Sequence, residues 1–217
     1  MGEDRGEPGA APEVAEFWRR YADAFVLPLR GNALLGAFIR NPAVTGAYAE
    51  AWVKSLVESM AGQLHIATGA IIRPSDVTAG RNLRRLPQSD LILWDPRSMP
   101  PLFQTGGFAL VHTQAARAII EIKRTISSVA DLEKQLAAPR RRLLREYRPN
   151  VLGVVVSNRR PLHQGRVGRS WIARRTLEDP PPTVRLLDAR GRADAEGILG
   201  LIYFLRHVVV APGGGAV

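Results

Sequence analysis

The chain of 217 residues contains no cysteine. Disulfide bonds, zinc sites built on thiolates and a cysteine nucleophile are therefore excluded, and the composition is compatible with a reducing cytoplasm. The four histidines have no spacing that is typical of metal ligands, and the hydroxyls of Thr125 and Ser170 have no evident activating partner. A hydrolytic triad is therefore not expected.

Long hydrophobic runs are missing as well. No stretch approaches about 18 uninterrupted apolar residues, the length that indicates a membrane-spanning helix. The nearest candidate, ILGLIYFLRHVVV, is too short and carries Arg206 and His207. The first residues, MGEDRGEPGAAPEVAE, are acidic and lack an apolar core, so they do not resemble a signal peptide. We expect a cytoplasmic protein with no membrane partner.

Positive charge is abundant. Thirty lysines and arginines outnumber 20 aspartates and glutamates, so the formal net charge is +10 at pH 7. This excess favours a polyanionic partner, nucleic acid first and an acidic membrane surface second. The alternative is a GC-rich genome, because the bias towards alanine, arginine, glycine and proline is typical of one. Charge alone does not decide between these explanations.

Hydrophobic periodicity predicts alternating helices and strands. Helices are expected over 13–26, over 45–60, after a cap at Ser127 or Ser128, and over 194–209. Strands are expected over 64–72, 89–95, 118–123 and 151–158, with an edge strand from about residue 183. The strand–helix–strand order between 118 and 157 implies a parallel pair, whereas the earlier strands suit an antiparallel meander.

These elements predict an α/β fold with a mixed central sheet, helices on both faces, and an αβββαβ core. Extra helices are expected at the N-terminal and C-terminal sides of that core. We expect a disordered tail over 1–12, a single domain over 13–210 with its core at about 45–157, and a flexible tail over 211–217. Residues 73–87 and 99–107 are expected to be loops, and Pro139 should kink or break its helix.

The stretch RAIIEIKRT places two charges, Glu121 and Lys123, in an otherwise apolar strand. Because side chains alternate along a strand, both charges point to one face and the flanking isoleucines to the other. Asp90 opens the preceding strand and can approach Glu121 if the two strands pair. Two adjacent carboxylates repel each other unless a cation lies between them, and their oxygens suit Mg²⁺ or Mn²⁺. An exposed ion pair of Glu121 with Lys123 is the alternative.

The order of these segments resembles the PD-(D/E)XK nuclease superfamily: a helix carrying Glu50 is followed by QSDLILWD and then by IIEIK. The segments RRLPQSDLILWDPRSMPPLF and ARAIIEIKRTISSVADLEKQL are similar to a bacterial domain of unknown function within it. The resemblance covers roughly residues 45–157 and implies a restriction-endonuclease-like fold. In the motif that gives the superfamily its name, a proline directly precedes the aspartate. In this chain Ser89 stands at that position, and Pro87 is close by. After the lysine, Arg124 stands in place of a small residue.

The resemblance also implies roles for individual residues. Asp90 and Glu121 would be ligands of Mg²⁺ or Mn²⁺, together with the main-chain carbonyl of Ile122. Lys123 would be the catalytic lysine, and Glu50 would be a further possible metal ligand. Gln135, on the helix after the third strand, would be a possible helper.

The arginines gather after the third strand and in the loop before Asp90. One interpretation is a solvated charged surface, and the other is a surface that binds the nucleic-acid backbone. The candidates for backbone binding are Arg81, Arg84, Arg85, Arg140, Arg141, Arg142, Arg145, Arg159, Arg160, Arg166 and Arg169.

The resemblance therefore predicts a divalent-metal-dependent nuclease that hydrolyses phosphodiester bonds in DNA, with a role in defence or DNA processing. A catalytically inactive module that keeps the fold and binds nucleic acid or an acidic protein partner is the alternative. A homodimer is a further possibility, because many such nucleases act as dimers to cut both strands.

Overall fold

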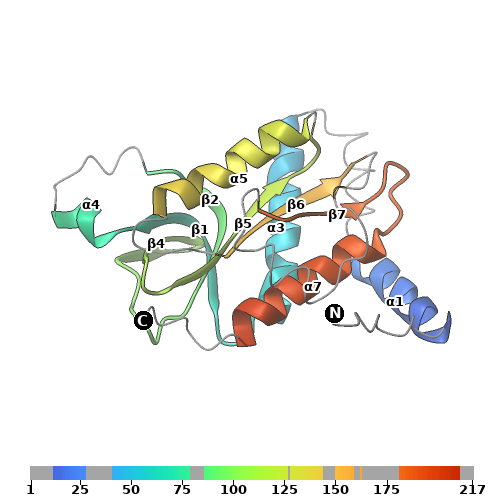
Figure 1. Cartoon of the computed structure of the whole chain (residues 1–217), viewed down its shortest axis with the longest axis horizontal. Helices are drawn as coiled ribbons and strands as arrows, with labels where there is room; N and C mark the ends of the chain where they lie inside the picture. Colours follow the sequence, from blue (N-terminus) through green and yellow to red (C-terminus); the bar gives the residue numbers. More distant parts are fainter. Residues whose placement is uncertain are drawn as a thin grey trace, which may run out of the picture.

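The computed structural model describes residues 12–27, 41–78, 86–126, 128–143, 150–158, 162 and 181–210. Its centre is a seven-stranded mixed sheet in the order β3-β4-β1-β2-β5-β6-β7, with helices packed on both faces (Figure 1). The α/β class, the mixed sheet and its coverage on two faces were all predicted from the sequence and are confirmed.

The elements follow one another in a mixed order. The helices are α1 (Pro12–Phe25), α3 (Pro42–Met60), α4 (Pro74–Thr78), α5 (Val129–Leu143) and α7 (Ala195–Val210). The strands are β1 (His65–Ile72), β2 (Ser89–Trp94), β3 (Phe103–Thr105), β4 (Phe108–His112), β5 (Ala116–Lys123), β6 (Asn150–Ser157) and β7 (Thr183–Leu187). No helix in these parts of the chain is long and apolar enough to cross a membrane.

The central strands pair as the sequence predicts. β1 pairs antiparallel with β2, and β2 pairs antiparallel with β5. β5 and β6 are parallel and are connected through α5, and β7 continues the parallel pairing at the sheet edge. The carboxyl ends of β5, β6 and β7 therefore lie along one edge of the sheet.

Two local expectations were wrong. Residues 103–112 form the β3–β4 hairpin, in which Gly106 has a φ of +51° and Gly107 follows it in the two-residue turn. Pro74 begins the short helix α4, where buried Asp76 accepts hydrogen bonds from Arg73. Pro139 was expected to kink or break its helix, and it does not break it, because α5 continues past this residue. The carbonyl four residues earlier belongs to exposed Gln135, where water can replace the missing hydrogen bond.

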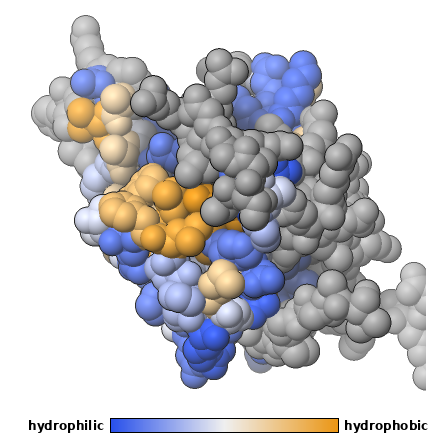
Figure 2. Space-filling model, turned by 90° about the vertical axis from the view of Figure 1, so that its left-hand side faces the viewer, coloured by the Kyte–Doolittle hydropathy of each residue, from blue (hydrophilic) through white to orange (hydrophobic). Residues whose placement is uncertain are grey.

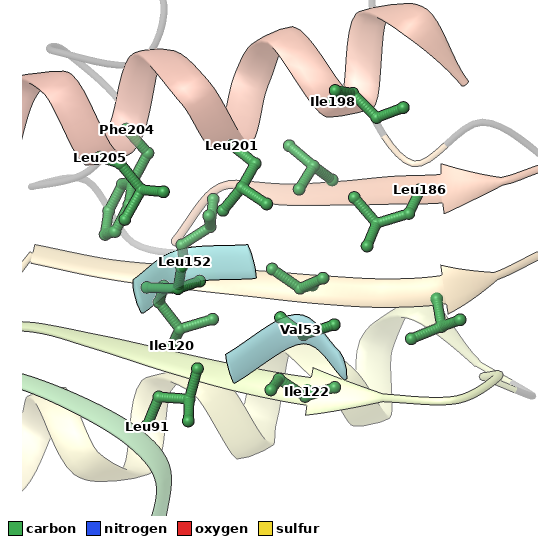
Figure 3. Close-up of a cluster of buried hydrophobic side chains, with 14 of the residues drawn as sticks. Val53, Leu91, Ile120, Ile122, Leu152, Leu186, Ile198, Leu201, Phe204 and Leu205 are labelled. Atoms are coloured by element: carbon green, nitrogen blue, oxygen red, sulfur yellow. The ribbon is translucent and has the colours of Figure 1, made fainter. Parts of the chain in front are cut away.

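The larger hydrophobic core lies between the sheet and helices α3 and α7 (Figure 3). Val53 of α3 and Leu201 of α7 are fully buried with Ile120 of β5. The face of α3 that packs on the sheet is formed by Ala49, Val53 and Val57, which are buried, whereas Tyr48 is 38% exposed.

The second core covers the opposite face of the sheet. Leu132 and Leu136 of α5 pack with Ile119 of β5 and Ile92 of β2. Trp94 is also fully buried in this cluster. Ile119 and Ile120, which are consecutive in β5, thus belong to the cores on opposite faces of the sheet. Burial on both faces is expected for a central strand.

Side chains at the helix starts fix where these helices begin. Asn41 accepts a hydrogen bond from the main-chain nitrogen of Ala43 at 3.0 Å, next to a proline at the first turn of α3. Ser128 accepts one from the main-chain nitrogen of Asp131 at 3.4 Å, so the predicted cap of α5 is Ser128.

On the side where α4 and β4 lie, hydrophobic residues form a surface patch among hydrophilic ones (Figure 2).

Candidate active site

Asp90 and Glu121 come from neighbouring antiparallel strands. Leu91 of β2 is paired with Ile120 of β5, so the next pair along this ladder is Asp90 with Glu121. Side chains directly opposite each other in antiparallel strands lie on the same face, with Cβ atoms about 4.5–5.5 Å apart. The pairing register thus brings together the two carboxylates that the sequence singled out.

Asp90 is held by the backbone and by the neighbouring lysine. Its Oδ2 accepts a hydrogen bond of 2.6 Å from the main-chain nitrogen of Ile122 and lies 3.9 Å from Lys123 Nζ. Thr68 of β1 donates its hydroxyl hydrogen to the Asp90 carbonyl at 2.9 Å. The aspartate is therefore fixed by three strands of the sheet, and its other carboxylate oxygen is not used in these contacts.

Glu121 is a buried carboxyl group, 8% exposed, in an apolar strand. Burial and the nearby charge of Asp90 raise its pKa to about 8, although Lys123 and a hydrogen bond with Ser89 act in the opposite direction. Its Oε1 has no hydrogen-bond partner in the part of the chain that is described. A buried carboxylate oxygen without a partner is costly unless a cation or proton satisfies it.

Glu50 approaches the same group from α3, which packs on β5. The pKa of Glu50 is raised by partial desolvation and by the charge of Asp90, and Lys123 lowers it. Glu50 also contributes to the raised pKa of Glu121. All four charged side chains predicted for the site, including Lys123, are therefore close enough to influence one another.

These residues fit a divalent cation in charge and in donor type. A cation next to Asp90 and Glu121 would offset their repulsion and satisfy Glu121 Oε1, and oxygen donors are those that Mg²⁺ and Mn²⁺ prefer. Within the described ranges, however, no three His, Cys, Asp or Glu side chains are grouped so as to hold a metal ion. A site here would rest on the two carboxylates, with main-chain or water oxygens completing it.

Two contacts of the site were not anticipated from the sequence. Ser89 is buried and hydrogen-bonds to Glu121. Thr68, which lies on β1 and precedes Asp90 by 22 residues, donates a hydrogen bond to the Asp90 carbonyl. Ser89 stands where the superfamily's name has a proline, which was the only available signal for it. Nothing in the local sequence distinguishes Thr68.

Asp95, the other acidic residue near β2, has a structural environment. Its carboxylate binds Arg97 at 3.0 Å and Arg117 at 3.5 Å, and its carbonyl accepts a hydrogen bond from Ser98. The side-chain hydrogen bond from Arg97 lowers the pKa of Asp95 to about 2, although burial acts to raise it. Asp95 therefore stabilises the turn after β2.

Most of the predicted nucleic-acid-binding arginines fall outside the described residues. These are Arg81, Arg84, Arg85, Arg145, Arg159, Arg160, Arg166 and Arg169. The backbone of Arg140, Arg141 and Arg142 lies in α5, and their side chains lie outside the described part of the chain.

Two of the four histidines have structural contacts. His65 lies edge-on to Trp94, with the ring centres 5.5 Å apart, and the His112 ring accepts a hydrogen bond from the Gln114 main chain.

No protein-family model matches the chain, and no curated protein matches its sequence. The fold is nevertheless similar to solved structures of NucC, a PD-(D/E)XK-like nuclease. The cAAA-bound form of E. coli MS115-1 NucC has a TM-score of 0.58 at 13% sequence identity, over 95% of this chain and 96% of that one.

Two further structures give the same result. The cAAA-bound form of P. aeruginosa ATCC27853 NucC has a TM-score of 0.61 at 11% identity, over 90% of this chain and 93% of that one. The apo form of the E. coli protein has a TM-score of 0.53 at 13% identity, over 89% and 91%. The chain thus has the restriction-endonuclease-like fold that the sequence predicted.

Proposed function

We propose that this protein is a divalent-metal-dependent nuclease that hydrolyses phosphodiester bonds in DNA. The observation that carries the proposal is the meeting of Asp90, Glu121 and Lys123, with Glu121 Oε1 buried and without a partner in the described structure. The fold shared with NucC supports the same reaction class, and the net charge of +10 suits a polyanionic substrate.

Asp90 and Glu121 would hold Mg²⁺ or Mn²⁺, with the main-chain carbonyl of Ile122 as a further oxygen donor. A divalent ion at such a site lowers the pKa of bound water and offsets negative charge on phosphate. The 2.6 Å hydrogen bond from the Ile122 nitrogen keeps Asp90 in one orientation. Ser89 does the same for Glu121, so both carboxylates are positioned by the fold.

Lys123 is partly exposed, with 34% of its side chain accessible, so its ammonium group can reach a substrate. There it would orient the attacking water and stabilise negative charge on the phosphate as the phosphorus–oxygen bond to the leaving group breaks. Glu50 is exposed on α3 and would be a further oxygen donor or a proton acceptor at the edge of the site.

We also propose how the domain, the tails and the arginines of the chain are organised around the site. A single domain over 13–210 would carry the site, with tails at 1–12 and 211–217. The arginines of the long loops would contact the DNA backbone and thus provide affinity with little sequence preference. Defence or DNA processing is the proposed setting.

Cleavage of supercoiled plasmid by the purified chain tests this function. We expect nicking with Mg²⁺ or Mn²⁺, no nicking in EDTA, and a loss of nicking in Glu121→Gln. The assay is run with and without cAAA, because two similar NucC structures are cAAA-bound forms. No cleavage of single-stranded or duplex DNA by the wild-type chain under all these conditions would favour the inactive nucleic-acid-binding module instead.

A further inference from the structure

The edge of the sheet that carries Lys123 continues as a basic surface along the neighbouring parallel strands. Arg124 follows directly after β5, and its carbonyl accepts a hydrogen bond from the main-chain nitrogen of Ser157 at 2.9 Å. Asn158, after β6, donates its main-chain hydrogen to the carbonyl of Leu187 at 3.2 Å. These bonds tie the carboxyl ends of β5, β6 and β7 together in a row.

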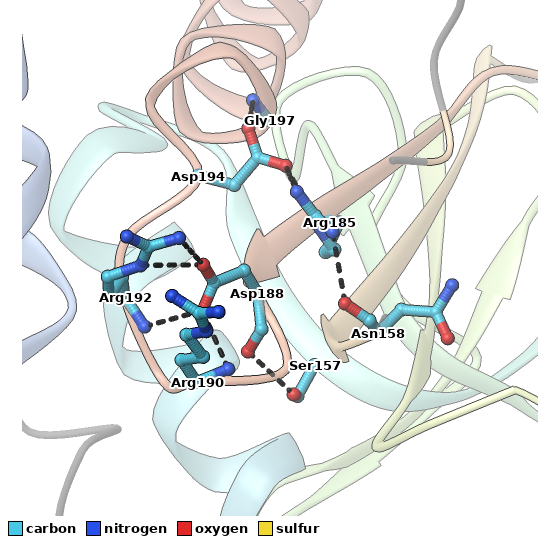
Figure 4. A network of polar contacts seen from close by, with 8 residues as sticks. All are labelled: Ser157, Asn158, Arg185, Asp188, Arg190, Arg192, Asp194 and Gly197. Atoms are coloured by element: carbon cyan, nitrogen blue, oxygen red, sulfur yellow. Dashed lines mark hydrogen bonds and ion pairs between the residues drawn. The ribbon is translucent and has the colours of Figure 1, made fainter. Parts of the chain in front are cut away.

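After β7 the chain forms a tight turn over residues 188–192, organised by Asp188 (Figure 4). One carboxylate oxygen of Asp188 accepts hydrogen bonds from the main-chain nitrogens of Arg190 and Arg192, at 2.8 and 3.0 Å. The other binds the Arg192 guanidinium at 2.8 Å. Gly191 has a φ of +73°, which a residue with a side chain rarely adopts. The turn therefore holds Arg190 and Arg192 in a defined place.

The same turn is anchored to the body of the protein. Ser157 donates its hydroxyl hydrogen to the Asp188 carbonyl at 3.2 Å. Buried Arg185 of β7 binds Asp194 at 2.6 Å and the Asn158 carbonyl at 3.0 Å, as Figure 4 shows. Asp194 in turn accepts a hydrogen bond from Gly197 in the first turn of α7. Consequently, little conformational entropy would be lost when this turn contacts a ligand.

Arg124 and Arg190 are both exposed. Within the described structure no acidic side chain forms an ion pair with either guanidinium group, whereas Arg192 is paired with Asp188. Burial acts to raise the pKa of Asp188, but the hydrogen bonds from Arg192 and Arg190 outweigh it and lower the pKa, so this aspartate stays charged. Two available positive charges therefore lie on the edge that carries Lys123: Arg124 follows it directly in the chain, and Arg190 lies two strands further along, after β7.

We infer that Arg124 and Arg190 form a contact surface for the phosphate backbone of duplex DNA, extending from Lys123 across β6 to the turn after β7. This inference rests on the proposed nuclease function and adds the direction in which the substrate lies. Guanidinium groups bind phosphate oxygens well, and here the backbone that carries them is anchored to the sheet. The surface reads charge and shape, so it contributes affinity without sequence preference.

The spacing of the strands suits this direction. Neighbouring strands lie about 4.8 Å apart, so the turn after β7 is on the order of 10 Å from the end of β5. Phosphates of one DNA strand advance about 3.4 Å along the helix axis. At that separation, Arg190 and Lys123 would contact different phosphates of the DNA backbone.

The salt dependence of binding to a labelled 30-base-pair duplex, measured in EDTA to prevent metal-dependent cleavage, tests this surface. Removing one arginine that neutralises a phosphate lowers the slope of log K against log salt by about 0.9. We expect that decrease, and about fivefold to tenfold weaker binding at 0.1 M salt, in Arg124→Gln and in Arg190→Gln, with roughly twice the slope change in the double variant.

Arg206→Gln is the matched control. Arg206 is exposed on α7, about 16 Å along the helix from its first residue, so its removal changes the net charge equally but leaves the proposed surface intact. We expect the wild-type slope for this variant, and thermal melting of all variants verifies that they are folded.

Unchanged slopes in Arg124→Gln and Arg190→Gln, an equal decrease in Arg206→Gln, or no binding by the wild type would overturn the inference. The combined binding and cleavage results also distinguish a failure of the proposed surface from a failure of the proposed nuclease function. Plasmid cleavage together with unchanged slopes would refute only this surface. Decreased slopes in the two arginine variants without any cleavage would support the surface and refute the nuclease.

Discussion

The main-chain nitrogen of Ile122 donates a hydrogen bond of 2.6 Å to Asp90 Oδ2. This bond joins the two strands at the point where Glu121 and Lys123 flank Ile122, so the position of Asp90 depends on the strand that carries the other site residues. The backbone of β5 thus aligns both halves of the proposed metal site.

The Asp90–Ile122 bond can be separated from the charge of Asp90 by two substitutions. Asp90→Asn keeps an oxygen that can accept from Ile122, whereas Asp90→Ala leaves that nitrogen without an acceptor. We expect Asp90→Ala to be less stable than Asp90→Asn by about 1–3 kcal/mol in urea unfolding without metal. Both variants should lose metal-dependent cleavage, and equal stability of the two would show that the bond contributes nothing.

Lys123→Ala tests whether the lysine acts on the substrate. Removing one charged donor from a reacting phosphate is expected to slow plasmid nicking by about 10²-fold or more. Mn²⁺ affinity should not fall, because Lys123 supplies no oxygen ligand and opposes a bound cation. A variant that nicks plasmid at the wild-type rate would refute the catalytic assignment.

The Asp95 ion pairs predict a pH-dependent contribution to stability. Because the pKa of Asp95 is about 2 in the folded protein and 3.8 ordinarily, its charged form stabilises the fold above about pH 4. That stabilisation is lost as the pH falls towards 2. We expect Asp95→Asn to be less stable than wild type at pH 7, with the difference shrinking by pH 2.5. A difference that stays constant with pH would contradict the assignment.

Two helical glycines should respond oppositely to alanine. A Cβ atom at Gly197 would lie 1.7 Å from the Arg185 carbonyl oxygen, so Gly197→Ala must displace α7 from β7. A Cβ atom at Gly46 in α3 would meet nothing within 4 Å. We therefore expect Gly197→Ala to destabilise the protein clearly and Gly46→Ala to stabilise it by about 0.5–1 kcal/mol. Chemical denaturation measures both, and a neutral Gly197→Ala would contradict the close packing.

Much of the fold could be predicted because its central strands have strong local patterns. The runs LHIATGAII and VLGVVVSN are apolar and contain β-branched residues, and they coincide with β1 and β6. The β3–β4 hairpin was missed because Pro100, Pro101 and two glycines surround short segments, and this composition suits a loop equally well. The parallel pairing of β4 with β1 depends on tertiary contacts that no local pattern records.

The candidate site was predictable only in part. Asp90, Glu121 and Lys123 stood out because charges on apolar strands need an explanation, and their order resembled a known superfamily. The approach of Glu50 depends on how α3 packs against β5. The position of Arg190 beside that edge depends on β7 joining the sheet next to β6, which its sequence does not specify.

Binding of Mn²⁺ in solution tests the central claim most directly. Isothermal titration of the metal-free protein should show saturable binding for the wild type and for Glu58→Gln, an exposed glutamate further along α3. Glu121→Gln should bind at least about tenfold more weakly, because it removes a charged oxygen ligand. If Glu121→Gln binds Mn²⁺ as tightly as the wild type, or if the wild type binds none, Asp90 and Glu121 do not form a metal site.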